Sequence, residues 1–478
     1  MKKKFMALFL AAVTVTSVLA GCGGSGNSGT TAAEGETTDT ASPEAGAETE
    51  AVTEAGTETT AEGESASAAE VNEDGTVNNP EDVTADGDKL MFWSIFSGGD
   101  GDFMDQIIAD YNGKTQEKQV QSIMLVWDDY YTKLQTSVAT GKGPDIGVAH
   151  TSKLPELVEA GVVEPIDDYL NELGIDMSAM YSENSLASVQ FDGQTYAVPL
   201  DTHAEILYYN KDILEEAGVE LNAEGELEIT GKDQFLEILD KVKGVMGDGE
   251  SPIAMGNGGD DPYRIWWTSY FQMGGTPLIS EDGTEATMDK DVALKATEFV
   301  KSLYDDGYVL RGIEDHVNLF TGGKAGFMMG GTWLTGTLEK VEGLNFGAMP
   351  LPKWFDNDAC WADSHTLVLP VKEGRSEEDT KAAVNFIVSA SKDGGLIWAE
   401  SGQIPASLDV INSPEYAALP YRSEYASALQ TAVLPPKSPA FGAIKNETVE
   451  SLDAVWTDSA EPADAVDAIY ESIQSNLN

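Results

Sequence analysis

Cysteine is nearly absent from this chain, and basic side chains are scarce. The 478 residues contain 2 cysteines, and 28 lysines and arginines stand against 82 aspartates and glutamates. The formal net charge of −54 repels phosphate backbones and anionic headgroups. We therefore expect neither nucleic acid nor an acidic lipid surface as a partner.

Long hydrophobic runs are also missing, since no apolar stretch reaches the length that spans a bilayer. A short apolar run at 5–13 follows three lysines and leads through small residues to Leu-Ala-Gly-Cys at 19–22. This order of basic, apolar and small residues predicts a secretory signal peptide over 1–22.

The sequence at 19–22 resembles a bacterial lipobox. The resemblance implies cleavage before Cys22 and lipidation of its thiol, which would anchor the protein to the outer face of the cytoplasmic membrane. The alternatives are a plain secretory signal with an incidental cysteine, or a weak membrane anchor. With Cys22 lipidated, Cys360 has no disulfide partner, so stability has to come from burial of apolar surface.

Residues 23–88 contain no basic and no aromatic side chain and consist largely of Gly, Ser, Thr, Ala and Glu. Such a segment cannot bury enough apolar surface to offset the entropy lost on ordering. We expect a disordered acidic linker that tethers the rest of the chain.

From residue 89 onward, strand patterns and helix patterns alternate. An apolar strand at 89–93 precedes a helical period at 103–111, a strand at 119–126 precedes a helix at 128–139, and another strand covers 146–149. This alternation predicts an α/β fold with mainly parallel sheets covered by helices. Strand signals return after a largely helical region, so the chain is expected to cross between two lobes more than once.

Several short segments match a known family in order and spacing. They are Thr-Gly-Lys-Gly-Pro-Asp at 140–145, Gly-Val-Val-Glu-Pro-Ile-Asp at 161–167, Tyr-Ala-Val-Pro-Leu at 196–200, Leu-Tyr-Tyr-Asn-Lys-Asp at 207–212, Phe-Thr-Gly-Gly-Lys-Ala-Gly-Phe-Met-Met-Gly at 320–330, Phe-Gly-Ala-Met-Pro-Leu-Pro at 346–352 and Gly-Gln-Ile-Pro at 402–405. In these segments the chain resembles the extracellular solute-binding proteins of carbohydrate ABC importers, the family 1 group that includes maltose-binding protein.

The resemblance implies a type II periplasmic-binding-protein-like fold with a hinge of several segments. By similarity, the first lobe takes 89–200 plus 349–402, and the second takes 201–348 plus 403–478. A mono- or oligosaccharide would be held between the lobes, whose closure would present a surface to the permease subunits. We expect a monomer that needs no cofactor and meets the membrane only through its lipid.

A sugar ring needs flat aromatic surfaces and hydrogen-bonding groups at its edges. Ligands of open α/β sheets lie beyond the carboxyl ends of the strands. In the first lobe, the residues at such positions are Trp93, Asp100, Trp127 and His150. The alternatives are core packing for the two tryptophans and a structural role for His150.

Asp201 and His203 lie at the first predicted crossing, where a carboxylate could accept two sugar hydroxyls. A hinge turn with Asp201 capping backbone amides is the alternative. Asp363 and His365 precede the last strand of the first lobe and resemble a cleft segment, although His365 could instead pack against the hinge.

In the second lobe, Gly331, Thr332 and Trp333 match the family pattern of a strand, small residues and a tryptophan that stacks on sugar, with core packing of Trp333 as the alternative. The segment 261–270 resembles a family segment whose aromatic residues face the sugar. Its Trp266 and Trp267 point about 100° apart on a helix, so one of them is expected to face the cleft.

No catalytic constellation is recognisable. The histidines show no His-x-x-x-His spacing for a metal, and neither a Gly-x-Ser-x-Gly motif nor a phosphate loop occurs. A glycosidase pair of Asp201 and Asp363 lacks any feature that raises the pKa of one carboxyl. We therefore expect neither an enzyme nor a metal site.

Other classes of binding protein stay open. Few lysines and arginines occur near the predicted cleft, which argues against anionic ligands. A cationic or polyol ligand fits the acidic and aromatic residues, because cations bind to aromatic faces. A lipoprotein that adheres to glycans without transporting them is the remaining alternative.

Overall fold

The computed structural model describes residues 72, 75–97, 99–313 and 315–477. Cys22, the predicted signal peptide and the linker up to residue 71 lie outside the described residues. The described part of the chain belongs to one compact unit. Among its helices, none combines the length and the apolar character needed to cross a bilayer.

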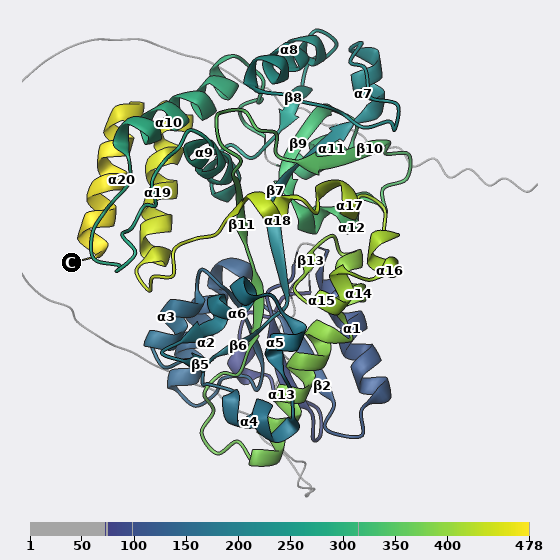
Figure 1. Cartoon of the computed structure of the whole chain (residues 1–478), viewed down its shortest axis with the longest axis vertical. Helices are drawn as coiled ribbons and strands as arrows, with labels where there is room; N and C mark the ends of the chain where they lie inside the picture. The colour runs from purple at the N-terminus through teal and green to yellow at the C-terminus, as the bar shows by residue number, and fades with distance from the viewer. Residues whose placement is uncertain (1–71, 73–74, 98, 314, 478) are drawn as a thin grey trace, which may run out of the picture. The chain divides into compact units, whose positions relative to one another are not determined.

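The first lobe forms around a core in which Phe92, Val148, Leu367 and Trp398 are fully buried. Its elements come mainly from residues 90–199 and return with 365–400 (Figure 1). They are β1 (Leu90–Ser94), α1 (Gly101–Lys114), β2 (Val120–Met124), α2 (Trp127–Ala139), β3 (Gly147–His150), α3 (Leu154–Glu159), α4 (Asp167–Leu173), α5 (Met177–Met180), α6 (Glu183–Val189), β4 (Gln190–Phe191), β5 (Gln194–Thr195), β6 (Ala197–Pro199), β12 (His365–Val368), α13 (Glu377–Lys392) and α14 (Gly395–Glu400).

The second lobe is built on a sheet with buried side chains on both faces. Leu207 and Tyr209 pack in one core and Ile206 and Tyr208 in another, because successive strand residues point to opposite faces. Its elements are β7 (Asp201–Asn210), α7 (Lys211–Glu216), α8 (Lys232–Lys243), β8 (Ser251–Ala254), α9 (Asp260–Gln272), α10 (Lys290–Asp305), α11 (His316–Thr321), β9 (Ala325–Gly331), η2 (Thr332–Leu334), α12 (Thr335–Leu338), β10 (Phe346–Pro350), β11 (Cys360–Asp363), β13 (Ile404–Pro405), α15 (Leu408–Ile411), α16 (Pro414–Ala417), α17 (Arg422–Tyr425), α18 (Ala428–Thr431), β14 (Ala432–Val433), α19 (Phe441–Trp456) and α20 (Pro462–Asn476).

The α/β class predicted from the sequence is present, but the sheets are not mainly parallel. β1 pairs with β2 in parallel, and β8 with β9. By contrast, β12 runs antiparallel to both β3 and β6, and β7 runs antiparallel to β9, β10, β11 and β13. Both of these strands follow a crossing between the lobes: β7 begins where the chain leaves the first lobe, and β12 begins where the chain returns to it.

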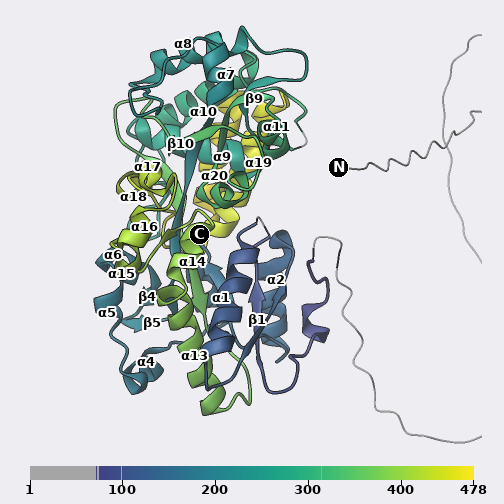
Figure 2. The same cartoon turned by 90° about the vertical axis from the view of Figure 1, so that its right-hand side faces the viewer.

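The two lobes are connected by strands that continue from one core to the other. β7 begins at Asp201 beside the first lobe and ends at Asn210, whose side chain accepts hydrogen bonds from the first amides of α7. β11 leads directly into β12, and this connection takes the chain back from the second lobe to the first. Both views show α7, α8 and α10 in one body and α1 and α13 in the other (Figure 1 and Figure 2).

One segment packs on the other side of the predicted lobe boundary. We expected the chain to return to the first lobe near residue 349, but Leu351, Trp354 and Trp361 pack in the larger core of the second lobe. The return occurs between Asp363 and His365, where β11 gives way to β12. Residues 351–362 are apolar enough for either core, so the local sequence does not mark this boundary.

The end of the predicted disordered linker is ordered. Thr76 forms a parallel bridge with Met124 at the edge of β2, and Val77 is buried. A short 3-10 helix, η1 (Pro80–Asp82), follows. The few apolar residues here cover the edge strand, which explains why this part departs from the composition-based prediction.

Gly402 is placed where no other residue fits without strain. Its φ of +111° lies in the region that favours glycine, and an added Cβ would lie 2.1 Å from the carbonyl oxygen of Thr332. We expect Gly402→Ala to lower the free energy of unfolding by about 3 kcal/mol, measured by urea denaturation.

Gly374→Ala is the matched control, because Gly374 has a φ of +80° with nothing within 4 Å of an added Cβ. It should cost about 1 kcal/mol, from backbone conformation alone. Equal losses in the two variants would show that the close approach to Thr332 does not matter.

Candidate ligand-binding site

A cavity of about 540 Å³ lies between the two lobes, a size common for sites that bind small molecules. The first lobe contributes ends of strands and the start of α2, and the second contributes α9, the end of β9, β11 and α19. The side chains that carry the site's chemistry are Asp100, Trp127, Tyr131, His150, Lys153, His203, Asp260, Asp261, Arg264, His316, Trp333, Trp361, Asp363, His365 and Lys445.

Three histidines meet at the floor of this cavity. His150 ends β3 and His365 begins β12, and the two face each other across the antiparallel pair. His203 on β7 is opposite Asp363 of β11. The ring centroids are 4.2 Å apart for His203 and His365 and 4.6 Å apart for His150 and His365, so three strands from distant parts of the sequence build one cluster.

The carboxylate of Asp201 supports two of these rings. It lies 3.1 Å from Nδ1 of His203 and 2.8 Å from Nδ1 of His365, and it accepts hydrogen bonds from the His365 amide and from Nε1 of Trp398. Burial by itself raises the pKa of Asp201, but the two histidines more than offset this and hold the pKa well below its usual range.

Arg264 contacts two tryptophans. Its guanidinium carbon is 4.9 Å from the ring centroid of Trp333 and 4.6 Å from that of Trp361, so it makes a cation–π contact with each ring. Asp261 and Asp260, one turn earlier on α9, are 3.2 Å and 3.4 Å from the same guanidinium. The stack therefore holds two indole rings and an arginine in fixed positions beside the cavity.

Glu205 is buried behind this stack, and neither carboxylate oxygen has a hydrogen-bond partner among the described residues. Its nearest cation is Arg264, at 3.8 Å, which already pairs with Asp260 and Asp261 at shorter distances. Burial raises the pKa of Glu205 to about 8, and Arg264 offsets this only in part. Glu205 is thus a neutral acid over much of the physiological range.

Many residues predicted for the site lie on the cavity lining. They are Asp100, Trp127, His150, His203, Gly331, Trp333, Asp363 and His365. Trp127 is 40% exposed, and Asp363 accepts hydrogen bonds from Thr151 and Ser152 that set its orientation. Contact of these residues with a ligand stays a prediction.

Other predicted residues are absent from the lining. Trp93 is buried in the first-lobe core, while Nε1 of Trp266 donates to Thr297 and Nε1 of Trp267 donates to the Val433 carbonyl. The reason is the direction of α9, whose first turn faces the cavity while both tryptophans one turn later face the core.

Asp201 and Thr332 are not part of the cavity lining, but each is hydrogen-bonded to a residue that is. Asp201 accepts the His365 amide, which agrees with the structural alternative considered for it, and Thr332 donates to Oε1 of the buried Gln403. Both side chains support residues that reach the cavity.

Sequence reasoning missed several lining residues, of which Trp361 could have been found from its spacing to residues already predicted. Trp361, Asp363 and His365 alternate along neighbouring strand positions, so they share a face. Tyr131, Arg264 and Lys445 are on helices whose orientation depends on tertiary packing.

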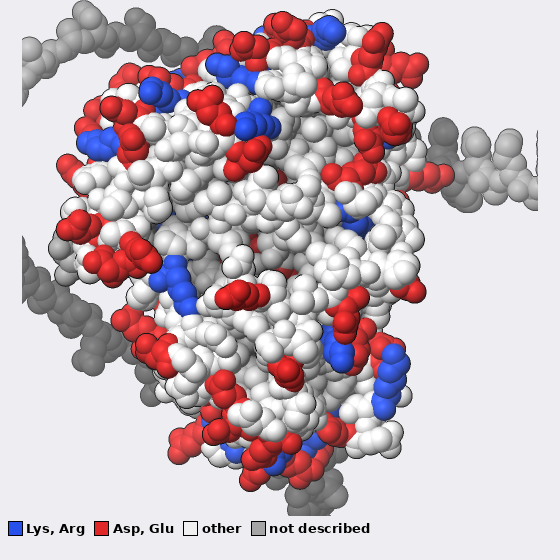
Figure 3. Space-filling view, in the orientation of Figure 1, with Lys and Arg blue, Asp and Glu red and all other residues white. Residues whose placement is uncertain are grey.

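The lining also contains more cations than expected, namely Lys153, Arg264 and Lys445. Each has a carboxylate partner: Lys153 lies 3.4 Å from Glu156, and Lys445 lies 2.7 Å from Asp260. Acidic side chains outnumber basic ones on the surface shown in Figure 3. The expectation of few basic groups near the cleft was therefore wrong, although these charges are compensated within the protein.

A family model described as bacterial extracellular solute-binding protein matches residues 106–423. The chain belongs to this family. It is a family of binding proteins that work outside the cytoplasm, and the predicted family and two-lobed fold class are confirmed.

Among relatives of this solute-binding protein is the maltotriose-binding protein of Pyrococcus abyssi, 22% identical over 401 residues, with 81% of this chain and 82% of the relative covered. The GacH receptor of Streptomyces glaucescens, solved alone and with acarbose, has a TM-score of 0.71 at 19% identity, covering 81% of this chain and 98% of the receptor. UgpB from Mycobacterium tuberculosis, in complex with glycerophosphocholine, also gives 0.71 at 19%, covering 82% and 99%. The two structures establish a shared fold.

The raised pKa of Glu205 predicts how stability depends on pH. The folded chain holds this proton up to a pH of about 8, whereas the unfolded chain releases it near 4.5. The stabilisation from Glu205 is therefore complete below 4.5 and is lost as pH rises towards 8. Between pH 5 and pH 8, the free energy of unfolding of the original chain should fall by about 2–4 kcal/mol relative to that of Glu205→Gln, which has no proton to lose. Urea denaturation at several pH values measures this difference.

Glu237→Gln on the exposed face of α8 serves as the control and should leave the pH dependence unchanged. A Glu205→Gln effect that is the same at pH 5 and pH 8 would mean that Glu205 is ionised throughout.

Proposed function

We propose that this solute-binding protein captures a mono- or oligosaccharide in the cavity between its lobes and delivers it to the permease of an ABC importer. The observation that carries the proposal is the combination of indole surfaces with hydrogen-bonding groups. Trp127, Trp333 and Trp361 line the same cavity as Asp100 and Asp363. A sugar presents an apolar ring face to the former and hydroxyl groups to the latter.

The charge arrangement favours a neutral ligand. Arg264 is paired with two aspartates and covered by two indole rings, and Lys445 is paired with Asp260. An anionic ligand would have to compete with these carboxylates for the cations. The maltotriose named for the Pyrococcus abyssi relative supports a neutral carbohydrate.

A glycerophosphodiester is the second candidate. Three basic side chains reach the cavity, and UgpB, which shares the fold, was solved with glycerophosphocholine. This ligand would draw Lys153 or Lys445 away from its present partner. The sugar proposal requires no such rearrangement.

For the cellular context, we propose a monomeric lipoprotein without catalytic activity. The order of lysines, apolar run and Leu-Ala-Gly-Cys at 19–22 supports cleavage before Cys22 and lipidation of its thiol. A polar segment then separates the anchor from the folded lobes. Such a tether lets the lobes reach a permease in the same membrane.

Sugar binding by the purified full chain is expected in calorimetric titrations with a panel of mono- and oligosaccharides. Trp127→Ala and Trp333→Ala should each weaken the affinity about tenfold, or about 1.4 kcal/mol, through loss of a stacking surface. Leu310→Ala is the control, because Leu310 is 39% exposed, as Trp127 is at 40%, but is not part of the cavity lining. It should bind as the original chain does.

Binding of glycerophosphocholine in place of every sugar would favour the second candidate. Conversion of a sugar into products would show an enzyme. Failure of both ligand classes to bind would overturn the proposal.

Lipidation is tested separately by expressing the full chain and Cys22→Ala in a bacterium fed a labelled fatty acid. The original chain should carry the label and partition with membranes. The variant should lose the label, because no other residue can accept the diacylglyceryl group at the cleavage site. Equal labelling of both chains would contradict the anchor.

A further inference from the structure

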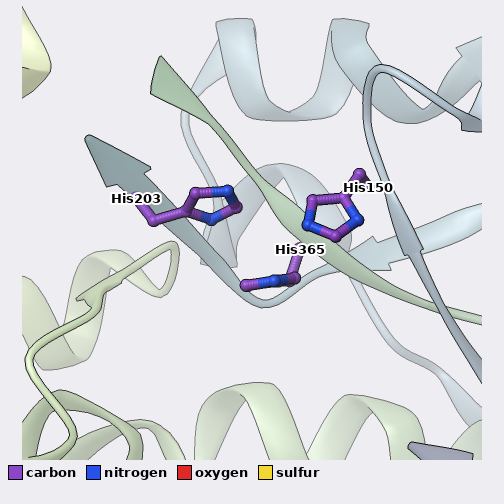
Figure 4. A group of neighbouring side chains, drawn as sticks. All are labelled: His150, His203 and His365. Atoms are coloured by element: carbon purple, nitrogen blue, oxygen red, sulfur yellow. The ribbon is translucent and has the colours of Figure 1, made fainter. Parts of the chain in front are cut away.

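We propose that His150, His203 and His365 form a binding site for a divalent transition-metal ion, with Zn²⁺ as the ion that fits best. One ring nitrogen of each histidine lies within 4.8 Å of those of the other two, and all three residues are on the cavity lining. Figure 4 shows the three imidazole rings converging from separate strands. This site goes beyond sugar capture and does not depend on it.

Hydrogen bonds to Nδ1 orient all three rings. The hydroxyl of Tyr131 lies 2.6 Å from Nδ1 of His150, and the carboxylate of Asp201 binds Nδ1 of His203 and of His365. Within the described part of the chain, no protein group is hydrogen-bonded to Nε2 of these rings. For His203 and His365 this is the arrangement typical of metal-binding histidines, in which a carboxylate holds one nitrogen and the second is left for the ion. His150 matches it in the tautomer whose Nδ1 donates to the Tyr131 hydroxyl.

The tautomer follows from the chemistry of the partner. An ionised carboxylate can only accept hydrogen bonds, so Nδ1 of both His203 and His365 carries a proton, and Nε2 of the neutral ring keeps its lone pair. Burial lowers the pKa of His150 and of His203, which favours their neutral forms, whereas at His365 the Asp201 carboxylate outweighs burial and raises the pKa, so an ion bound there displaces a proton from that ring when it is charged. Neutral imidazole is the form that binds metals.

The strands hold the cluster close to the spacing that a metal requires. His365 pairs directly with His150 across β12 and β3, and the centroids of His150 and His203 are 5.5 Å apart. With Zn–N bonds of about 2.0–2.1 Å, tetrahedral nitrogens lie about 3.3 Å from one another. Side-chain rotations that move each nitrogen by roughly 1 Å would reach this geometry.

The donor set selects the class of ion. Imidazole nitrogens suit Zn²⁺, Cu²⁺ and Ni²⁺, whereas Ca²⁺ and Mg²⁺ prefer oxygen ligands. Three histidines on a cavity wall also leave a fourth position open, which solvent or a ligand hydroxyl could occupy. The sequence-based expectation of no metal site rested on the missing His-x-x-x-His spacing, which does not apply to ligands from three strands.

Calorimetric titration of the purified full chain with ZnCl₂ tests the site. The chain must carry no histidine tag, and excess Mg²⁺ should be present to occupy surface carboxylates. We expect one Zn²⁺ per chain. His150→Gln, His203→Gln and His365→Gln should each weaken the affinity at least about tenfold, because each removes one nitrogen ligand.

His316→Gln is the matched control. His316 lines the same cavity but lies outside the three-histidine cluster, and its Nδ1 is 3.4 Å from Asp261. This variant should bind Zn²⁺ as the original chain does. Urea denaturation of each variant shows whether it is folded. Co²⁺ in place of Zn²⁺ should give the visible absorption of a tetrahedral site in the original chain and in His316→Gln, but in none of the three cluster variants.

Three outcomes would overturn the proposal: no Zn²⁺ binding above the Mg²⁺ background, equal binding by folded cluster variants, or loss of binding in His316→Gln alone. A chain that binds Zn²⁺ but no sugar would refute the proposed function and leave the metal site intact. The reverse result would refute the metal site and leave the transport function intact.

Discussion

The buried carboxylate of Asp201 is the constraint on which the centre of the molecule depends. It stands at the first residue of β7, where the chain leaves the first lobe, and its side chain is fully buried. A charge in such a place is tolerated only when hydrogen-bond donors surround it. The indole of Trp398, the amide of His365 and the rings of two histidines supply these donors, so one side chain ties α14, β12 and β7 together.

The cavity next to this carboxylate combines rigid surfaces with charges that are already paired. Arg264 makes cation–π contacts with Trp333 and Trp361 and is paired with aspartates of its own helix. Because these groups are held by each other, little ordering of side chains is left for the moment of binding. Preorganisation of this kind suits the capture of a solute, and the three-histidine cluster on the same wall offers a chemically distinct set of ligand atoms.

Local patterns predicted much of the architecture, but strand pairing escaped them. Alternating strands and helices indicated the α/β class, and short motifs indicated the family. Neither could show that β7 and β12 insert antiparallel to their neighbours, since a strand's partner is not encoded in its own residues. The same limit explains the misplaced return to the first lobe, because residues 351–362 have no local mark of the core they join.

For the site, the sequence by itself determined the chemistry available near strand ends, including Trp127, His150, Trp333, Asp363 and His365, because strand ends and loop residues can be read from periodicity. Only the tertiary structure decided which side of α9 faces the cavity, burying Trp266 and Trp267 and exposing Arg264 to the ligand space. It also decided that histidines more than 50 residues apart along the chain converge within 4.8 Å. Side-chain direction and long-range convergence depend on packing between elements, which no local pattern records.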